Sequence, residues 1–284
     1  MKKHTILVPT DFSENAWTAL YYASTLAKEY HWELHILHTY NNLNFSSIKE
    51  TFLEMEGLKE KENLDLKMKE LSTRLENVFP SLKARTSCMF GDLSKIILDL
   101  LQDQDYRLVI MGTKGSGWAK SRTIGSNTYD IIKSSPIGVL AVPQGYNAFK
   151  LNKLGLLTNF KKSEISLLQS FMDRIERPFE ISLLHVTERD RPVENQQIAF
   201  WKDQIYQSVA IKDIEYIEKE AVHRLDYHMP IPNCINWMID KLDVDLLLVS
   251  YNRKSFFREL FSKSLPRSIA HNLNIPTYFK SNND

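Results

Sequence analysis

Short apolar runs alternate with longer segments of helical periodicity along the whole chain, and this alternation constrains the fold more than any other feature. Between the apolar runs, side chains such as Leu64, Met68, Leu71 and Leu75 recur at steps of three and four, which predicts helices with one buried face. Strands that alternate with helices form βαβ units, and these build a parallel sheet covered on both faces. In the first half we predict strands at residues 6–8, 34–39, 83–89, 108–111 and 139–142, and helices at 49–78, 93–101 and 126–134.

The pattern then starts again, which indicates an internal duplication. Residues 143–153, with Gly145 and two lysines, form the predicted boundary. We therefore predict an α/β protein of two tandem doubly wound domains, residues 1–146 and 151–284, each a five-stranded parallel sheet flanked by helices. The second copy has about ten residues fewer between its second and fourth strands. The echoed segments, in order, are 10–12 and 158–160, 36–39 and 183–186, 107–112 and 245–250, and 135–139 and 275–279.

The composition excludes several classes of partner. Lys and Arg number 36 against 35 Asp and Glu, so no global charge favours nucleic acid or an anionic membrane. Cys88 and Cys234 are too few for a disulfide framework or a thiolate zinc site, and they favour a reducing, cytoplasmic location. No apolar run approaches the roughly 20 residues that cross a bilayer, so we expect no membrane contact.

The glycine-rich segment 111–128 begins where a predicted strand ends and leads into a predicted helix. Ligands of open α/β sheets bind at this place, beyond the carboxyl ends of the strands. Glycines let backbone N–H groups approach an anion, and we expect Ser126 to cap the helix, whose first turn attracts phosphate. The segment has no Gly-Lys-Ser/Thr of a Walker A loop, and Lys120 stands where a dinucleotide fingerprint needs its last glycine. A flexible connector is the alternative, and whether Lys114, Lys120 and Arg122 contact phosphate stays open.

The spacing of the segment favours a ligand site. Gly112, two residues, Gly115, nine residues and then Gly125-Ser126 resembles the phosphate and ribose motif of the universal stress protein family. Residues 6–13, 37–38 and 136–143 are similar to that family's first, second and last strands, so the resemblance covers the first half. It implies a five-stranded parallel sheet and an adenine nucleotide, ATP or AMP, with or without Mg²⁺.

The resemblance also implies roles for individual residues. Asp11 would meet the ribose or adenine, since a carboxylate suits sugar hydroxyls, although a helix N-cap is an equally good local reading. Thr39 would border the adenine through its backbone. The implied nucleotide-binding set is Pro9, Thr10, Asp11, Thr39, Met111, Gly112, Thr113, Gly115, Gly125, Ser126, Asn127 and Thr128, of which the last four would hold the β- and γ-phosphates.

The second half departs from this motif. Side chains at Ser250 and Arg253 would fill space that a phosphate needs, so we expect the second domain to keep the fold and to have lost the site. The basic residues near Arg253 read as a solvated face that could still attract an anion. Asn159, Ser250, Arg253 and Lys263 stand for Asp11, Gly112, Gly115 and Gly125, and only Ser264 keeps the identity of Ser126.

The resemblance implies an ATP-binding regulatory or stress-response module, and the departures in the second half predict that the nucleotide is held in the first domain alone. A slow ATPase or nucleotide-dependent enzyme, and an interaction scaffold that binds no nucleotide, are the alternatives; no catalytic residue is identified. No metal site is predicted, because strand alternation sends His35 and His38 to opposite faces. The family resemblance implies an internal pseudo-dimer through residues 139–142 and 277–280, and leaves a further homodimer open.

Overall fold

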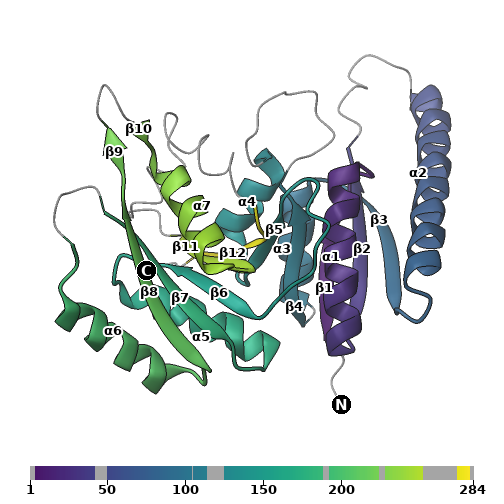
Figure 1. Ribbon diagram of the computed structural model, residues 1–284. Coiled ribbons are helices and arrows are strands. Elements are labelled where there is room, and N and C mark those ends of the chain that lie inside the picture. Colours follow the sequence, from purple (N-terminus) through teal and green to yellow (C-terminus); the bar gives the residue numbers. More distant parts are fainter. Residues whose placement is uncertain are drawn as a thin grey trace.

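The computed structural model describes residues 4–41, 50–103, 105–113, 125–187, 192–223, 228–251 and 274–281. Ten of its strands form one sheet in the order β3-β2-β1-β4-β5-β12-β11-β6-β7-β8, which runs across the molecule in Figure 1 with α2 and α6 at opposite ends. Gly115 and residues 252–273 lie outside the described residues, and so do the predictions made for Lys114, Lys120, Arg122, Arg253, Lys263 and Ser264.

The first half contributes five parallel strands and four helices. The predicted strands are confirmed with ends shifted by up to two residues, and the helix at 126–134 is confirmed at both ends. The elements are β1 (Thr5–Pro9), α1 (Glu14–Tyr30), β2 (Glu33–Tyr40), α2 (Glu50–Val78), β3 (Ala84–Phe90), α3 (Leu93–Asp103), β4 (Tyr106–Gly112), α4 (Ser126–Ser134) and β5 (Val139–Val142).

The second half has the same strand order, read in the opposite direction along the sheet, and its five long strands are also parallel to one another. The residues it lacks fall in the helix after its second strand, since α6 has 14 residues where α2 has 29. The elements are β6 (Lys153–Leu157), α5 (Lys162–Ile175), β7 (Glu180–Thr187), α6 (Asn195–Ser208), β8 (Asp213–Glu220), a hairpin of β9 (Val222–His223) and β10 (His228–Met229), α7 (Ile231–Leu242), β11 (Leu246–Tyr251) and β12 (Thr277–Ser281).

Alternation along the strands gives the sheet two apolar faces, and helices bury both. On one face Ile6 and Val8 share a core with residues of α1, α2, α5 and α6. On the other face Leu7 and Val109 share a core with residues of α3, α4 and α7. None of the described helices is both long enough and apolar enough to span a membrane.

The two halves meet where β5 pairs antiparallel with β12. Val139 lies opposite Phe279, and these two residues are themselves equivalent positions of the duplication, so the pairing is centred on a local pseudo-two-fold axis. Gly138 and Tyr278 are likewise equivalent, and the Tyr278 ring lies where a Cβ on Gly138 would be. One continuous sheet therefore replaces the two separate sheets that periodicity alone suggests.

Candidate functional site

The carboxyl ends of β1 and β4 lie side by side, since the two strands pair in parallel. From β1 the chain continues to β2 on one side, and it returns later to β4 on the other. This reversal of strand order is a topological switch point, the position at which open α/β sheets bind ligands. Asp11 follows β1 and Thr113 follows β4, so the two ends of the predicted site meet here.

The turn after β1 is held by a set of local hydrogen bonds. The Thr10 hydroxyl accepts from the backbone N–H of Phe12 at 3.1 Å, and Asp11 Oδ1 accepts from that of Ser13 at 3.0 Å. Ser13 is the N-cap of α1, because its Oγ accepts from the N–H of Ala16 at 3.1 Å. The alternative role of Asp11 as the N-cap is therefore wrong: Asp11 orders the turn one step earlier.

A histidine on the neighbouring strand, His38, positions the same turn. His38 Nδ1 donates to the Thr10 carbonyl at 2.7 Å, and its ring packs against Phe12 with 4.5 Å between ring centroids. Phe12 has φ +62°, a left-handed conformation that lets the chain turn sharply from β1 into α1. The preceding residue, Asp11, therefore lies just beyond the carboxyl end of β1.

The end of β4 is tied to α4 and β5. Thr113 N–H donates to the Val142 carbonyl at 3.0 Å, and Gly125 N–H donates to the Thr113 carbonyl at 2.7 Å. The Thr128 hydroxyl donates to the Gly112 carbonyl at 2.9 Å. Thr113 and Gly125, which lie on either side of residues 114–124, are therefore hydrogen-bonded to each other, and the first turn of α4 lies beside the end of β4.

The N-terminus of α4 differs from the prediction. Gly125 is the N-cap and Ser126 is the first helical residue, and within the part of the chain that the structure describes no side chain caps the helix. The predicted capping by Ser126 is wrong, because the glycine before it already takes the extended cap conformation (φ −59°, ψ 149°). The first N–H groups of a helix have no partner within it. With Ser126 and Asn127 exposed, the first turn presents backbone donors and a positive dipole end to solvent.

The described residues of the predicted set do not share one environment. Asp11, Gly125, Ser126 and Asn127 are accessible. Thr39 is half-buried in β2, one strand farther from α4, and is paired with Met89 of β3. Five of the set are buried, which limits them to backbone contacts or to shaping the site: Pro9, Thr10, Met111, Thr113 and Thr128.

The turn after β6 repeats this backbone geometry with different side chains. His185 Nδ1 donates to the Thr158 carbonyl at 2.8 Å and Phe160 has φ +60°, as His38 and Phe12 do in the first half. Glu164 stands where the first half has Ala16. Its carboxylate accepts from the Thr158 hydroxyl at 2.6 Å and from the N–H groups of Asn159 at 2.9 Å and Lys161 at 3.1 Å.

Glu164 is 1% exposed, and burial raises the pKa of its carboxyl, while the three hydrogen bonds oppose that rise. An acidic side chain of the protein itself therefore takes the donors of the second turn. At the end of β11, Ser250 is buried in the position of Gly112.

His35 and His38, three residues apart on β2, lie in different surroundings. As strand alternation predicts, His35 and His38 bond to different partners: His35 bonds to Tyr106 and Ser87, and His38 to the Thr10 carbonyl. Within the described residues no group of three or more His, Cys, Asp or Glu side chains is arranged to hold a metal ion.

Comparison with known proteins gives a family and a fold. Residues 3–143 match the model of the universal stress protein family. A universal stress protein from Archaeoglobus fulgidus is 16% identical, covering 99% of this chain and 97% of that one, with a TM-score of 0.63. A protein named as a putative universal stress protein, from Pseudomonas aeruginosa, is 12% identical and covers 98% of this chain and 93% of that one, with a TM-score of 0.53. No curated protein matches.

Proposed function

Because the chain belongs to the universal stress protein family, we propose that it is an adenine-nucleotide-binding, stress-response regulator that holds ATP or AMP in its first half. The observation that carries the proposal is that two features stand at the β1/β4 switch point: Asp11 follows the end of β1, and the N-terminus of α4 is bonded to the end of β4. A carboxylate for a sugar and a helix end for phosphates are the two recognition elements that a nucleotide needs.

Each element has a defined role in the proposal. Asp11 Oδ1 accepts from Ser13, and a carboxylate has further lone pairs with which to accept the ribose hydroxyls. The first-turn N–H groups of Ser126, Asn127 and Thr128 bind the phosphates, and the family motif assigns Gly115 to the same ligand. Thr39 contributes backbone atoms next to the base. The exposed, uncapped helix end fits a phosphate, and Mg²⁺ bound with it would neutralise part of its charge.

The proposal assigns nucleotide to the first half alone. In the second half the Asn159 and Lys161 N–H groups donate to the Glu164 carboxylate, so these backbone donors are not available to a phosphate. Ser250 places a side chain where the first half has Gly112. Both differences act against an anion.

We further propose that residues 1–146 and 151–284 are two domains that form an internal pseudo-dimer in the cytoplasm. The centred β5–β12 pairing supports it, and so do contacts beside the sheet. Arg107 pairs with Glu176 at 2.7 Å, Arg177 pairs with Glu29 at 2.9 Å, and Arg174 donates to the Arg107 carbonyl at 2.8 Å.

The test is the release of bound nucleotide from the purified protein, identified by mass analysis, followed by calorimetric titration of the nucleotide-free chain with ATP. We expect one site per chain. Gly125→Val should weaken ATP binding by tenfold or more, because a branched side chain then stands at the helix end. Ala148→Val, which introduces the same valine side chain at an exposed residue outside the site, should leave ATP binding unchanged.

Three outcomes would contradict parts of the proposal. Undiminished affinity in Gly125→Val shows that the site assignment is wrong, and two sites per chain show that the second half also binds. Absence of any ATP or AMP binding favours the scaffold alternative. A turnover assay on the same protein separates a binding module from a slow ATPase.

A further inference from the structure

A cavity lies at the end of the first half where the strands begin, opposite to the proposed nucleotide site. Its lining comes from two segments, within residues 27–33 and 79–83. There the C-terminal ends of α1 and α2 meet the amino ends of β2 and β3. The cavity has a volume of about 550 Å³, which is within the range of small-molecule sites.

The buried part of the lining is apolar and aromatic. Trp32 is 8% exposed and Phe79 is 7% exposed, and Ala27 is fully buried. The Trp32 ring packs against Tyr30 with 5.3 Å between ring centroids, and the Phe79 ring packs against Tyr21 at the same separation. Both rings are therefore held in place by neighbouring rings. An aromatic ligand can stack on such rings or meet them edge-on, which adds to the gain from burying apolar area.

The exposed part of the lining is basic. Lys28 stands in the last turn of α1, and Lys83 directly precedes β3; both are exposed, as is His31 between α1 and β2. Among the residues that the structure describes, neither lysine forms an ion pair or a side-chain hydrogen bond. Two ammonium groups at the opening of an apolar cavity suit a ligand that has a negative charge at one end.

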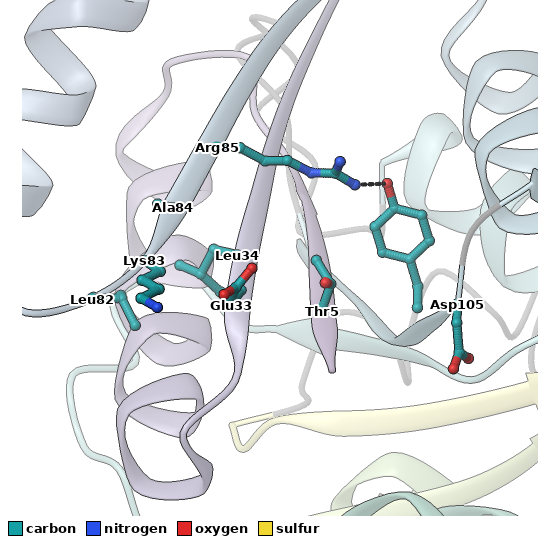
Figure 2. A pocket seen from close by; sticks show the side chains of 9 residues that line it. Thr5, Glu33, Leu34, Leu82, Lys83, Ala84, Arg85 and Asp105 are labelled. Carbon is teal, nitrogen blue, oxygen red and sulfur yellow. Dashed lines mark hydrogen bonds between the residues drawn. The ribbon is translucent and has the colours of Figure 1, made fainter. Parts of the chain in front are cut away.

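One acidic residue, Glu33, is also part of the described lining. Figure 2 is a close view of a neighbouring cavity that shares Leu82, Lys83 and Glu33 with this one, and it shows these three side chains close together, away from Asp105. Glu33 already has an interaction within the protein. The balance of the lining is therefore positive, which favours an anionic ligand over a cationic one.

The duplication provides an internal control, because the second copy has acidic residues at the equivalent basic positions. The C-caps of α1 and α5 are both left-handed, so counting back from them aligns the last turns of the two helices. Sheet register aligns the residue before β3 with the first residue of β8. The fold therefore forms without these basic side chains. The equivalent pairs are Lys28 and Asp173, His31 and Glu176, and Lys83 and Asp213.

The aromatic position is also covered differently in the two copies. Trp32 precedes the first residue of β2, and Phe179 precedes the first residue of β7. In the second copy the guanidinium of Arg177 lies 4.8 Å from the centre of the Phe179 ring, and that ring is fully buried. The second copy thus covers its aromatic ring with a cation of its own, whereas Trp32 lines a cavity.

We propose that this cavity binds a small aromatic carboxylate, a molecule with one aromatic ring system and one carboxylate on a short chain. The ring contacts Trp32 and Phe79, and the carboxylate accepts hydrogen bonds from Lys28 and Lys83. The site is separate from the proposed nucleotide site, because it lies at the amino ends of the strands and the nucleotide site lies at their carboxyl ends.

The test titrates the full-length protein by calorimetry with phenylacetate, 3-phenylpropionate and indole-3-acetate. We expect saturable binding of at least one of these probes. Two further compounds separate the ends of the ligand: the amide of the best probe keeps the ring without the charge, and hexanoate keeps the charge without a ring. Each should bind roughly tenfold or more weakly, because each lacks one of the two recognition elements.

Substitutions test the basic end of the cavity. Lys83→Asp introduces the residue of the second copy, and it should weaken binding of the best probe roughly tenfold or more and leave ATP affinity unchanged. Lys28→Gln should weaken probe binding in the same direction. Lys95→Asp, which makes the same change at an exposed lysine of α3 outside the cavity, is the matched control and should bind as the wild type does.

Circular dichroism checks the fold of each variant. The proposal is wrong if none of the probes binds saturably, if the amide or hexanoate binds as tightly as the best probe, or if a folded Lys83→Asp protein binds that probe normally. Displacement of the probe by ATP would show that both occupy one site, and would overturn the proposal of a separate one. The direct titrations need no ATP, so failure here and failure of the proposed function are separate outcomes.

Discussion

Gly112, a residue of the predicted nucleotide-binding motif, is also required for packing. A Cβ at this position would collide with the side chain of Asn15, and it would lie 2.9 Å from the Asn15 carbonyl oxygen. The absence of a side chain therefore lets α1 approach the end of β4. In the second copy Ser250 is accompanied by Ser163 at the position of Asn15, so a larger residue on the strand faces a smaller one on the helix.

We expect Gly112→Ala to lower the free energy of unfolding by about 1–3 kcal/mol, the usual cost of overpacking. Asn15→Ser combined with Gly112→Ala should recover part of the loss, because the side-chain collision disappears and the approach to the carbonyl remains. Urea denaturation of the single and double variants measures this, with Asn15→Ser alone as the control. Full stability of Gly112→Ala would contradict the packing role.

His35 gives the protein a pH dependence of predictable sign. The pKa of its imidazole is lowered from 6.5 to about 4 in the folded protein, so between these values the unfolded chain binds more protons than the folded one. The free energy of unfolding should therefore fall as the pH is lowered from about 6.5 towards 4. Chemical denaturation across this range should show a smaller fall in His35→Gln than in the wild type. His31→Gln, at an exposed histidine, should behave as the wild type does.

At the residue level the sequence predicts where a residue stands along an element better than it predicts what that residue contacts. Strand ends and glycine spacing are local patterns, and they placed Asp11 after the first strand and Gly125 before a helix, as the structure has them. Ser126 was misplaced by one position because serine is a favoured N-cap, yet Gly125 takes that place. The contact of His38 with Thr10, and that of Gly112 with Asn15, join residues distant in sequence or on separate elements, and no pattern of spacing contains them.

Where β5 pairs with β12, two residues of very different size come together. The equivalent residues Gly138 and Tyr278 are the smallest side chain and one of the largest fully buried ones, and the ring of one lies over the other. A pairing between two identical strands would place like with like, two glycines or two tyrosines. The pair found here is complementary, which favours pairing between the two halves of the chain over pairing of either half with its own copy.

This contact makes a prediction for the sheet. Gly138→Ala should lower the free energy of unfolding by about 1–3 kcal/mol, because the Tyr278 ring must move. In a Tyr278→Leu background the same substitution should cost much less, since the shorter side chain leaves room for a methyl group. A double-mutant cycle measured by denaturation gives the coupling. Additive losses would show that the two residues do not act on each other.

Periodicity predicted the regular elements to within a few residues, because each long strand and helix contains several repeats of its period. The hairpin of β9 and β10 was missed, since strands of two residues contain no alternation to detect. Periodicity also says nothing about which edges meet. The antiparallel partner of β5 was expected from the family resemblance alone, and the structure shows that partner to be β12.

For the whole molecule, the repeated segments predicted two copies of one α/β unit, and the long strands and helices follow that prediction. What the repeat cannot reveal is where the contacts of the two copies differ. The bond of Arg85 to Tyr106 and the buried carboxylate of Glu164 each depend on a side chain that the other copy replaces, with Glu215 and Ala16 respectively. Such differences appear only when equivalent positions are compared in three dimensions.

The pairing of β5 with β12 within one chain has a consequence for dilution. Two separate subunits joined through these edges would come apart as their concentration falls, whereas tethered partners stay at a high effective concentration at any expression level. The tether also removes the requirement of symmetry: a substitution in a homodimer appears twice, but here it appears once. Each half can therefore change its residues independently of the other. One half can bind a ligand while the other contributes only its strand to the β5–β12 pairing.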